Sequence, residues 1–220
     1  MTPLRVQTTA PLGYVAGHPV HLDALLMAVA AKRTGRPQPQ TADELAEVAI
    51  PIARSDCGRY YLASAAIGES AAHETRYTHH RFPMREAVHL AGPKLKRIDD
   101  GAGKHKSYRI PSERDHARGG LLAWYCVGER DAIRDLLEEV THIGRKRGVG
   151  EGMLTLRGER WTVEPCETWP GFPVLDPAGE ALRNLPLDTP GLASFRHAEA
   201  PLAPPYWLPS AELVATPVRR

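Results

Sequence analysis

The residues that point most directly to a chemistry lie in the loop Gly144-Arg-Lys-Arg-Gly-Val-Gly-Glu-Gly152, which holds four glycines in nine residues. Glycine lets the backbone adopt conformations closed to other residues and approach a ligand closely. Successive N–H groups of such loops bind anions, and Arg145, Lys146 and Arg147 add three positive charges. No Gly-Lys-Ser/Thr opens a helix here, which excludes a P-loop. A phosphodiester backbone lying across the loop fits these residues; a charged turn that only keeps the protein soluble is the alternative.

A second basic segment spans residues 76–118, where eleven Lys or Arg face five Asp or Glu although the whole chain carries only +2. A local excess of this kind suits a polyanion. Its clustered cations are Lys94, Lys96, Arg97, Lys104, Lys106 and Arg109, and its aromatic residues are Tyr77, Phe82 and Tyr108. Cations interleaved with aromatic rings allow phosphate pairing beside base stacking, so RNA is the expected ligand. A solvated charged face is the other interpretation.

The ten histidines invite a search for a metal site. His18, His21 and Asp23 have an HxxHxD spacing, but no further ligand follows at a recognisable distance along the chain. Asp23 is instead explained as a carboxylate in the first turn of a helix, where it complements the helix dipole. We therefore expect no metal and no other cofactor.

No catalytic residue can be assigned from the sequence. A metal-independent ribonuclease uses a histidine with lysine or tyrosine as general acid and base, and nothing separates the candidates from surface histidines. These candidates are His21, His79, His80 and His105. The cysteines Cys57, Cys126 and Cys166 match no nucleophile signature and no disulfide framework. Reduced thiols, no apolar run of membrane-spanning length and no signal peptide predict a cytoplasmic protein.

The pattern of apolar residues predicts the elements that position these segments. Apolar residues at i, i+3, i+4 and i+7 predict helices, whereas alternation or a short apolar run predicts strands. The expected helices cover 21–36 and 129–142, with a short one at 41–49, and the expected strands cover 4–9, 58–68, 121–127, 161–163 and a stretch from Met153. Residues 76–118 are expected to form a hairpin with a long polar tip between the two halves.

Two βαβ-like halves in this order predict an α+β, ferredoxin-like (RRM-like) core, with an antiparallel sheet and two helices. Eleven of the 20 prolines lie between Pro165 and Pro217, so the last quarter is expected to be irregular chain packed on that core. We divide the chain into a core, residues 1–164, and a proline-rich extension, residues 165–220.

Several segments resemble proteins of the RAMP superfamily of CRISPR effector complexes. They are HLDALLMAVAA, YYLASAA and above all IGRKRGVGEG at the end of the second long helix. The later segment GFPVLDPAGEALRNLPLD resembles the proline-bearing tail of the Csf family of type IV systems. The chain is thus similar to the subunit that caps the backbone of type IV complexes.

The resemblance matches Gly144, Gly148, Gly150 and Gly152 to the glycines of the family loop and the three intervening basic residues to its basic positions. It implies a thumb at about residues 85–112 that grips the RNA and a neighbouring subunit. The implied role is to hold the 5′ handle of the CRISPR RNA, without catalysis, beside backbone and large subunits. Contact with target DNA near the protospacer stays open, as do two alternatives: an endoribonuclease that processes CRISPR precursor RNA, and a general single-strand-binding module.

Overall fold

The computed structural model describes most of the chain. The described residues are 1–15, 19–35, 48–68, 72–80, 106–116, 120–145, 150–155, 158–206, 208–210 and 212–218. The chain divides into two compact units, which are described one at a time: Met1–Ala72 together with Asp115–Arg220, and His73–Arg114. The short helix expected at 41–49 falls mostly outside the described residues, and residues 48 and 49 are not helical.

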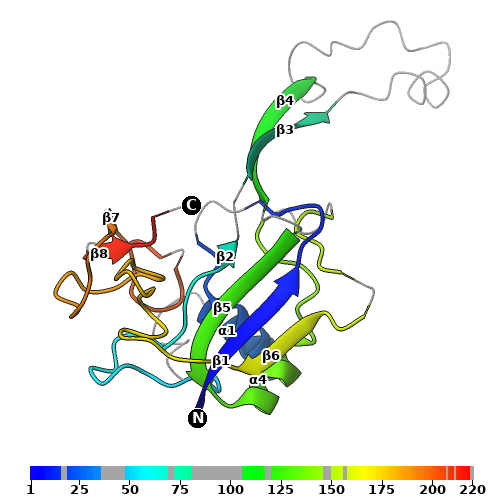
Figure 1. Cartoon of the computed structure of the whole chain (residues 1–220). Coiled ribbons are helices and arrows are strands. Elements are labelled where there is room, and N and C mark those ends of the chain that lie inside the picture. The colour runs from blue at the N-terminus through cyan, green and yellow to red at the C-terminus, as the bar shows by residue number, and fades with distance from the viewer. Residues whose placement is uncertain are drawn as a thin grey trace, which may run out of the picture. The chain divides into compact units, whose positions relative to one another are not determined.

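The first unit is built on an antiparallel sheet of four strands in the order β2-β5-β1-β6 (Figure 1). The strands are β1 (Thr2–Thr9), β2 (Ile67–Gly68), β5 (Leu121–Gly128) and β6 (Trp161–Pro165). Helix α1 (Leu22–Arg33) lies between β1 and β2 in the chain, and helix α4 (Arg130–Leu137) between β5 and β6. This order is compatible with a ferredoxin-like core. The predicted α+β fold, with an antiparallel sheet and two helices, is confirmed.

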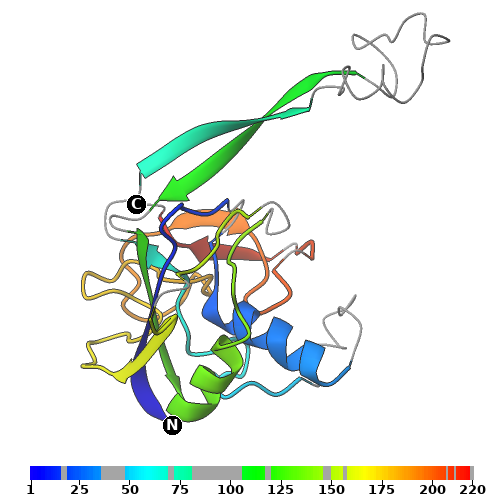
Figure 2. The ribbon, with the colours of Figure 1, turned by 90° about the vertical axis from the view of Figure 1, so that its right-hand side faces the viewer.

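The core lies between this sheet and the two helices, which cover the same face (Figures 1 and 2). Alternate residues of β1, Leu4 and Val6, are fully buried and lie opposite Cys126 and Trp124 of β5. Alternation of this kind directs one face of a strand into the core. The helices complete it with apolar side chains at helical spacing: Leu22, Leu26 and Val29 from α1, and Ile133, Leu136 and Leu137 from α4.

Helix α4 ends at Leu137, earlier than the predicted end at His142. The amide of Val140 bonds to the carbonyl of Leu137 at 2.9 Å, which tightens the last turn. The carbonyl of Val140 then accepts a hydrogen bond from the indole Nε1 of Trp161. Val140 and Ile143 still reach the core, so the apolar pattern continues beyond the helix itself.

The predicted strand at 58–68 is wrong over most of its length, since only Ile67–Gly68 forms one. The segment still follows β5, because the amide of Val127 bonds to the carbonyl of Leu62. A tight turn interrupts it where the amide of Ala63 bonds to the carbonyl of Tyr61 at 2.9 Å. The strand predicted from Met153 is likewise absent over the described residues 153–155, where Met153 makes one isolated bridge to His142.

The proline-rich extension packs on the core through a small apolar cluster of its own. Val174, Leu175, Ala181, Leu185 and Ala215 are buried together, with Tyr60 and Leu62 packed against them. Strands β7 (Arg196–Glu199) and β8 (Leu213–Thr216) form a two-stranded sheet beside this cluster. Trp169 meets the ring of Tyr125 of β5 edge-on, with centroids 5.0 Å apart. The extension is thus joined to the sheet by aromatic as well as aliphatic packing.

The second unit contains strands β3 (Ala72–His80) and β4 (Tyr108–His116), which pair in a two-stranded sheet. They lie where the sequence predicts the arms of the basic hairpin. The tip, residues 81–105, and with it most of the thumb expected at 85–112, lies outside the described residues.

Candidate nucleic-acid interface

The base of the glycine-rich loop is closed by backbone hydrogen bonds. The amide of Ile143 donates to the carbonyl of Gly152 at 2.9 Å, and the amide of Leu154 to that of Thr141 at 3.0 Å. The amide of Arg145 also donates to the carbonyl of Val15 at 2.6 Å. These bonds fix the stems of the loop to each other and to the segment that follows β1.

Two of the loop glycines have a structural reason to be glycine. Gly144 and Gly152 have positive φ angles of 72° and 67°. A Cβ at Gly144 would lie 2.5 Å from the carbonyl oxygen of Val15, and one at Gly152 would overlap the carbonyl oxygen of Ile143. Only a residue without a side chain fits such approaches. Gly150, with φ of 82°, has open space around its Cα.

The structure describes one of the three basic residues of the loop. Arg145 is exposed, whereas Lys146, Arg147 and Gly148 lie outside the described residues. The loop base lies at the end of β1, where the amide of Thr155 donates to the carbonyl of Thr9 at 3.0 Å. At this same edge of the sheet, Gly68, the last residue of β2, pairs with Leu122 near the start of β5.

The hairpin carries the other predicted RNA-binding residues that the structure describes, Lys106 and Arg109, and both are exposed. The guanidinium of Arg109 lies over the ring of Tyr77, 3.4 Å from its centroid. Tyr77 is 42 % exposed and Tyr108 47 % exposed. The predicted Lys94, Lys96, Arg97 and Lys104 lie outside the described residues.

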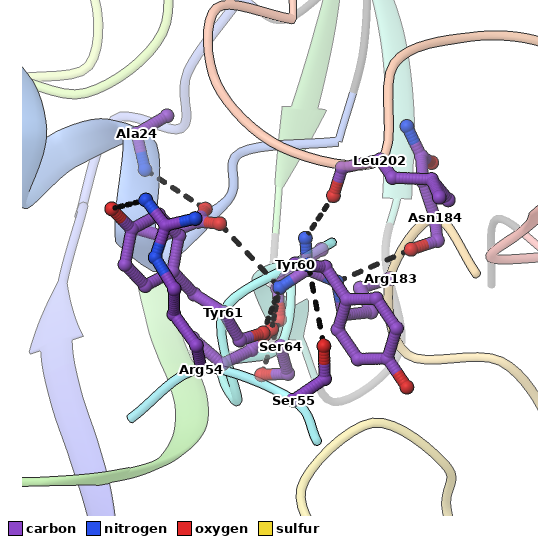
Figure 3. A network of polar contacts seen from close by, with 12 residues as sticks. Ala24, Arg54, Ser55, Tyr60, Tyr61, Ser64, Arg183, Asn184 and Leu202 are labelled. Atoms are coloured by element: carbon purple, nitrogen blue, oxygen red, sulfur yellow. Dashed lines mark hydrogen bonds and ion pairs between the residues drawn. The ribbon is translucent and has the colours of Figure 1, made fainter. Parts of the chain in front are cut away.

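The sequence pattern does not indicate the buried polar network around Arg183, which Figure 3 shows with its neighbours. This guanidinium is fully buried and donates to the carbonyls of Tyr61, Ala63 and Leu202 and to the hydroxyl of Tyr206. Its Nη1 lies 3.4 Å from Oδ2 of Asp23, which is also fully buried. The network therefore joins the extension to α1 and to the segment beside β5.

The interpretation of Asp23 as a carboxylate in the first turn of a helix accounts for only one of its two oxygens. Its Oδ1 does accept a hydrogen bond from the amide of Ala24 at 2.9 Å, but its Oδ2 accepts one from the hydroxyl of Tyr206 at 2.9 Å and faces Arg183. Burial raises the pKa of the Asp23 carboxyl, and the positive charge of Arg183 opposes that shift. Burial likewise raises the pKa of the Tyr206 hydroxyl well above its usual value.

His21, one of the histidines considered for ribonuclease chemistry, lies in the interior. It is 3 % exposed, and its ring stacks on that of Tyr206 with centroids 4.0 Å apart. The ring therefore contributes to packing around the network. Of the other candidates, His105 and the side chains of His79 and His80 lie outside the described residues.

Over the described ranges, no three side chains of His, Cys, Asp or Glu gather in a way that could hold a metal ion.

The three cysteines differ in exposure: Cys57 is exposed, Cys166 half-buried and Cys126 buried. Burial raises the pKa of the Cys126 thiol to about 12. None of the helices in the described part of the chain has the length and apolar character to cross a lipid bilayer.

A family model described as CRISPR type IV associated protein Csf3 matches residues 2–216. The chain belongs to the Csf3 family. The matched residues include the glycine-rich loop, the basic hairpin and the tail that carries Arg183, so all three segments lie within the region that the family model covers. The comparison with curated proteins gives no match.

Proposed function

We propose that this Csf3-family chain is a non-catalytic, RNA-binding subunit of a type IV CRISPR ribonucleoprotein. In this role it holds the 5′ handle of the CRISPR RNA and caps one end of the backbone filament. Membership of a family of CRISPR type IV associated proteins supports this setting. Guide pairing reads the target in RNA-guided complexes, which leaves backbone shape and handle bases for such a subunit to recognise.

The observation that carries the proposal is the anchored base of loop 144–152. Backbone bonds to Gly152 and Val15 hold both stems, and the exposed Arg145 begins a run of three basic residues. A loop whose base is already fixed loses less conformational entropy of its own when it binds an RNA strand. In the proposed complex, Arg145, Lys146 and Arg147 pair with phosphates of the RNA.

The proposed protein partners are the backbone and large subunits of the same complex. Tyr108 and Ile110 support such contacts, since each is 47 % exposed on the β3–β4 sheet. A two-stranded sheet with exposed apolar side chains gains stability when a partner covers it. The buried position of His21 gives no support to the endoribonuclease alternative.

Binding and cleavage assays on the purified chain test the proposal. Labelled CRISPR RNA is compared with the same RNA whose handle sequence is scrambled, in buffer without metal ions. We expect tighter binding of the natural handle and intact RNA after incubation. Equal affinity for both RNAs would point to a general single-strand binder, and a discrete cleavage product to an endoribonuclease.

A further inference from the structure

The hairpin carries an exposed pair of stacked side chains, Arg109 and Tyr77. The central carbon of the guanidinium lies 3.4 Å from the centroid of the tyrosine ring. Both side chains are exposed, so the pair covers no core of its own. An exposed cation–π pair contributes little to folding stability. The stability of the hairpin alone therefore does not account for the stacking of these two side chains.

Tyr77 lies against one face of the guanidinium, and the Arg109 side chain as a whole is exposed. Among the residues that the structure describes, Arg109 interacts with the ring of Tyr77 and with no carboxylate or hydrogen-bond partner. Tyr108 and Ile110, the residues on either side, point to the opposite face of β4, because successive side chains of a strand alternate. The Arg109–Tyr77 face of the ribbon is thus distinct from the apolar face.

We propose that the Arg109–Tyr77 stack is a platform for one nucleobase of a single-stranded RNA. The base lies on the face of the guanidinium opposite Tyr77, and the in-plane N–H groups donate to the adjacent phosphate. A planar guanidinium both stacks and forms bidentate hydrogen bonds, which a lysine ammonium cannot do. The proposal rests on the RNA-binding function proposed above and assigns a base-contacting residue within it.

A guanidinium that only neutralises a phosphate is replaceable by lysine, whereas a stacking one is not. The test therefore compares Arg109→Lys with the parent chain by fluorescence anisotropy, using fluorescein-labelled CRISPR RNA. We expect Arg109→Lys to bind about tenfold more weakly, at the lower end of what one base–aromatic stack contributes. Arg196→Lys, at an exposed arginine of β7, is the matched control and should bind as the parent does.

Tyr77 supplies a second comparison that does not depend on charge. Tyr77→Phe keeps the ring under the guanidinium and should bind within about twofold of the parent, whereas Tyr77→Leu should bind about tenfold more weakly. An equal decrease in the RNA affinity of both variants would overturn the proposal, because the affinity would then not depend on the aromatic ring.

Abasic substitutions scanned along the RNA identify the base. The parent should bind more weakly when one particular position is abasic, and Arg109→Lys should be insensitive to the abasic site there. If the parent binds RNA and Arg109→Lys matches it, the stacking platform is wrong while the RNA-binding function stands. If the parent does not bind RNA, both proposals fail.

Discussion

The attachment of the extension to the core depends on the side chain of Arg183. It donates to carbonyls of the core segment, at Tyr61 and Ala63, and of the extension, at Leu202. A buried guanidinium is costly unless its donors and its charge are satisfied, and Asp23 supplies the opposite charge. The same bonds occupy carbonyls that a regular strand at 58–68 would give to a neighbouring strand.

Replacing Arg183 with Met should lower the free energy of unfolding by about 3–5 kcal/mol, because it leaves the Asp23 carboxyl buried without its cation. The double variant Arg183→Met/Asp23→Asn should recover part of this decrease. Urea unfolding of the parent and the variants gives the comparison. A double variant whose destabilisation is the plain sum of the two single effects would contradict the coupling between these side chains.

The loop glycines differ in how much a side chain costs. Gly152→Ala should destabilise the protein by more than about 2 kcal/mol, since the new methyl group overlaps the carbonyl of Ile143. Gly150→Ala, with a similar φ but open space, should cost only about 1 kcal/mol of backbone strain. Equal destabilisation in urea unfolding would mean that the loop base is not closed as described.

Among the helices and strands, the sequence pattern correctly predicts those whose structure depends mainly on residues close together in the chain. The apolar run of β5 and the helical spacing of apolar residues in α1 each identify the element without reference to distant residues. Both elements lie within a few residues of the predicted bounds. Composition alone points to the loop 144–152, whereas the close contact that requires glycine at position 152 is visible only in the structure.

The errors lie where a distant residue decides the local structure. The carbonyl of Val140 accepts from Trp161, which lies 21 positions away, and α4 ends before it. Arg183 binds the carbonyl of Tyr61, which lies 122 positions away, where a strand was predicted. A buried Arg–Asp pair was missed because arginine and aspartate are ordinarily surface residues, and only the fold brings these two together.

The contact between α1 and the turn that follows α4 should depend on pH. Hydrogen bonding from Arg33 lowers the pKa of the Glu139 carboxyl below its usual value of 4.5, with help from Lys32. The stabilisation is therefore present above pH 4.5 and disappears as the pH falls through the lowered pKa. The difference in unfolding free energy between the parent and Glu139→Gln should shrink between about pH 5 and 3. A difference that stays constant over this range would contradict the ion pair.

For the molecule as a whole, the basic hairpin should be separable from the core. No residue of the second unit belongs to the apolar clusters found among the described residues. Replacing His73–Arg114 with a Gly-Ser linker should shift the melting temperature by no more than a few degrees, because loop length changes closure entropy only slightly. A large drop in thermal melting would mean that the hairpin is part of the core.

The same deletion should prevent assembly with CRISPR RNA and the other subunits, since it removes a large part of the basic segment 76–118. Gel filtration of the co-expressed complex provides this measurement. A variant that melts normally and still assembles would show that the basic segment is only a solvated face.

The salt dependence of RNA binding by the loop variant Arg145→Ala/Lys146→Ala/Arg147→Ala tests the central claim most directly. Removing one cation–phosphate pair should reduce the slope of log K against log salt concentration by roughly 0.7 for single-stranded RNA. We therefore expect weaker binding and a flatter slope for the variant than for the parent, measured on the same CRISPR RNA. A variant whose slope and affinity equal those of the parent would contradict a phosphate-binding loop.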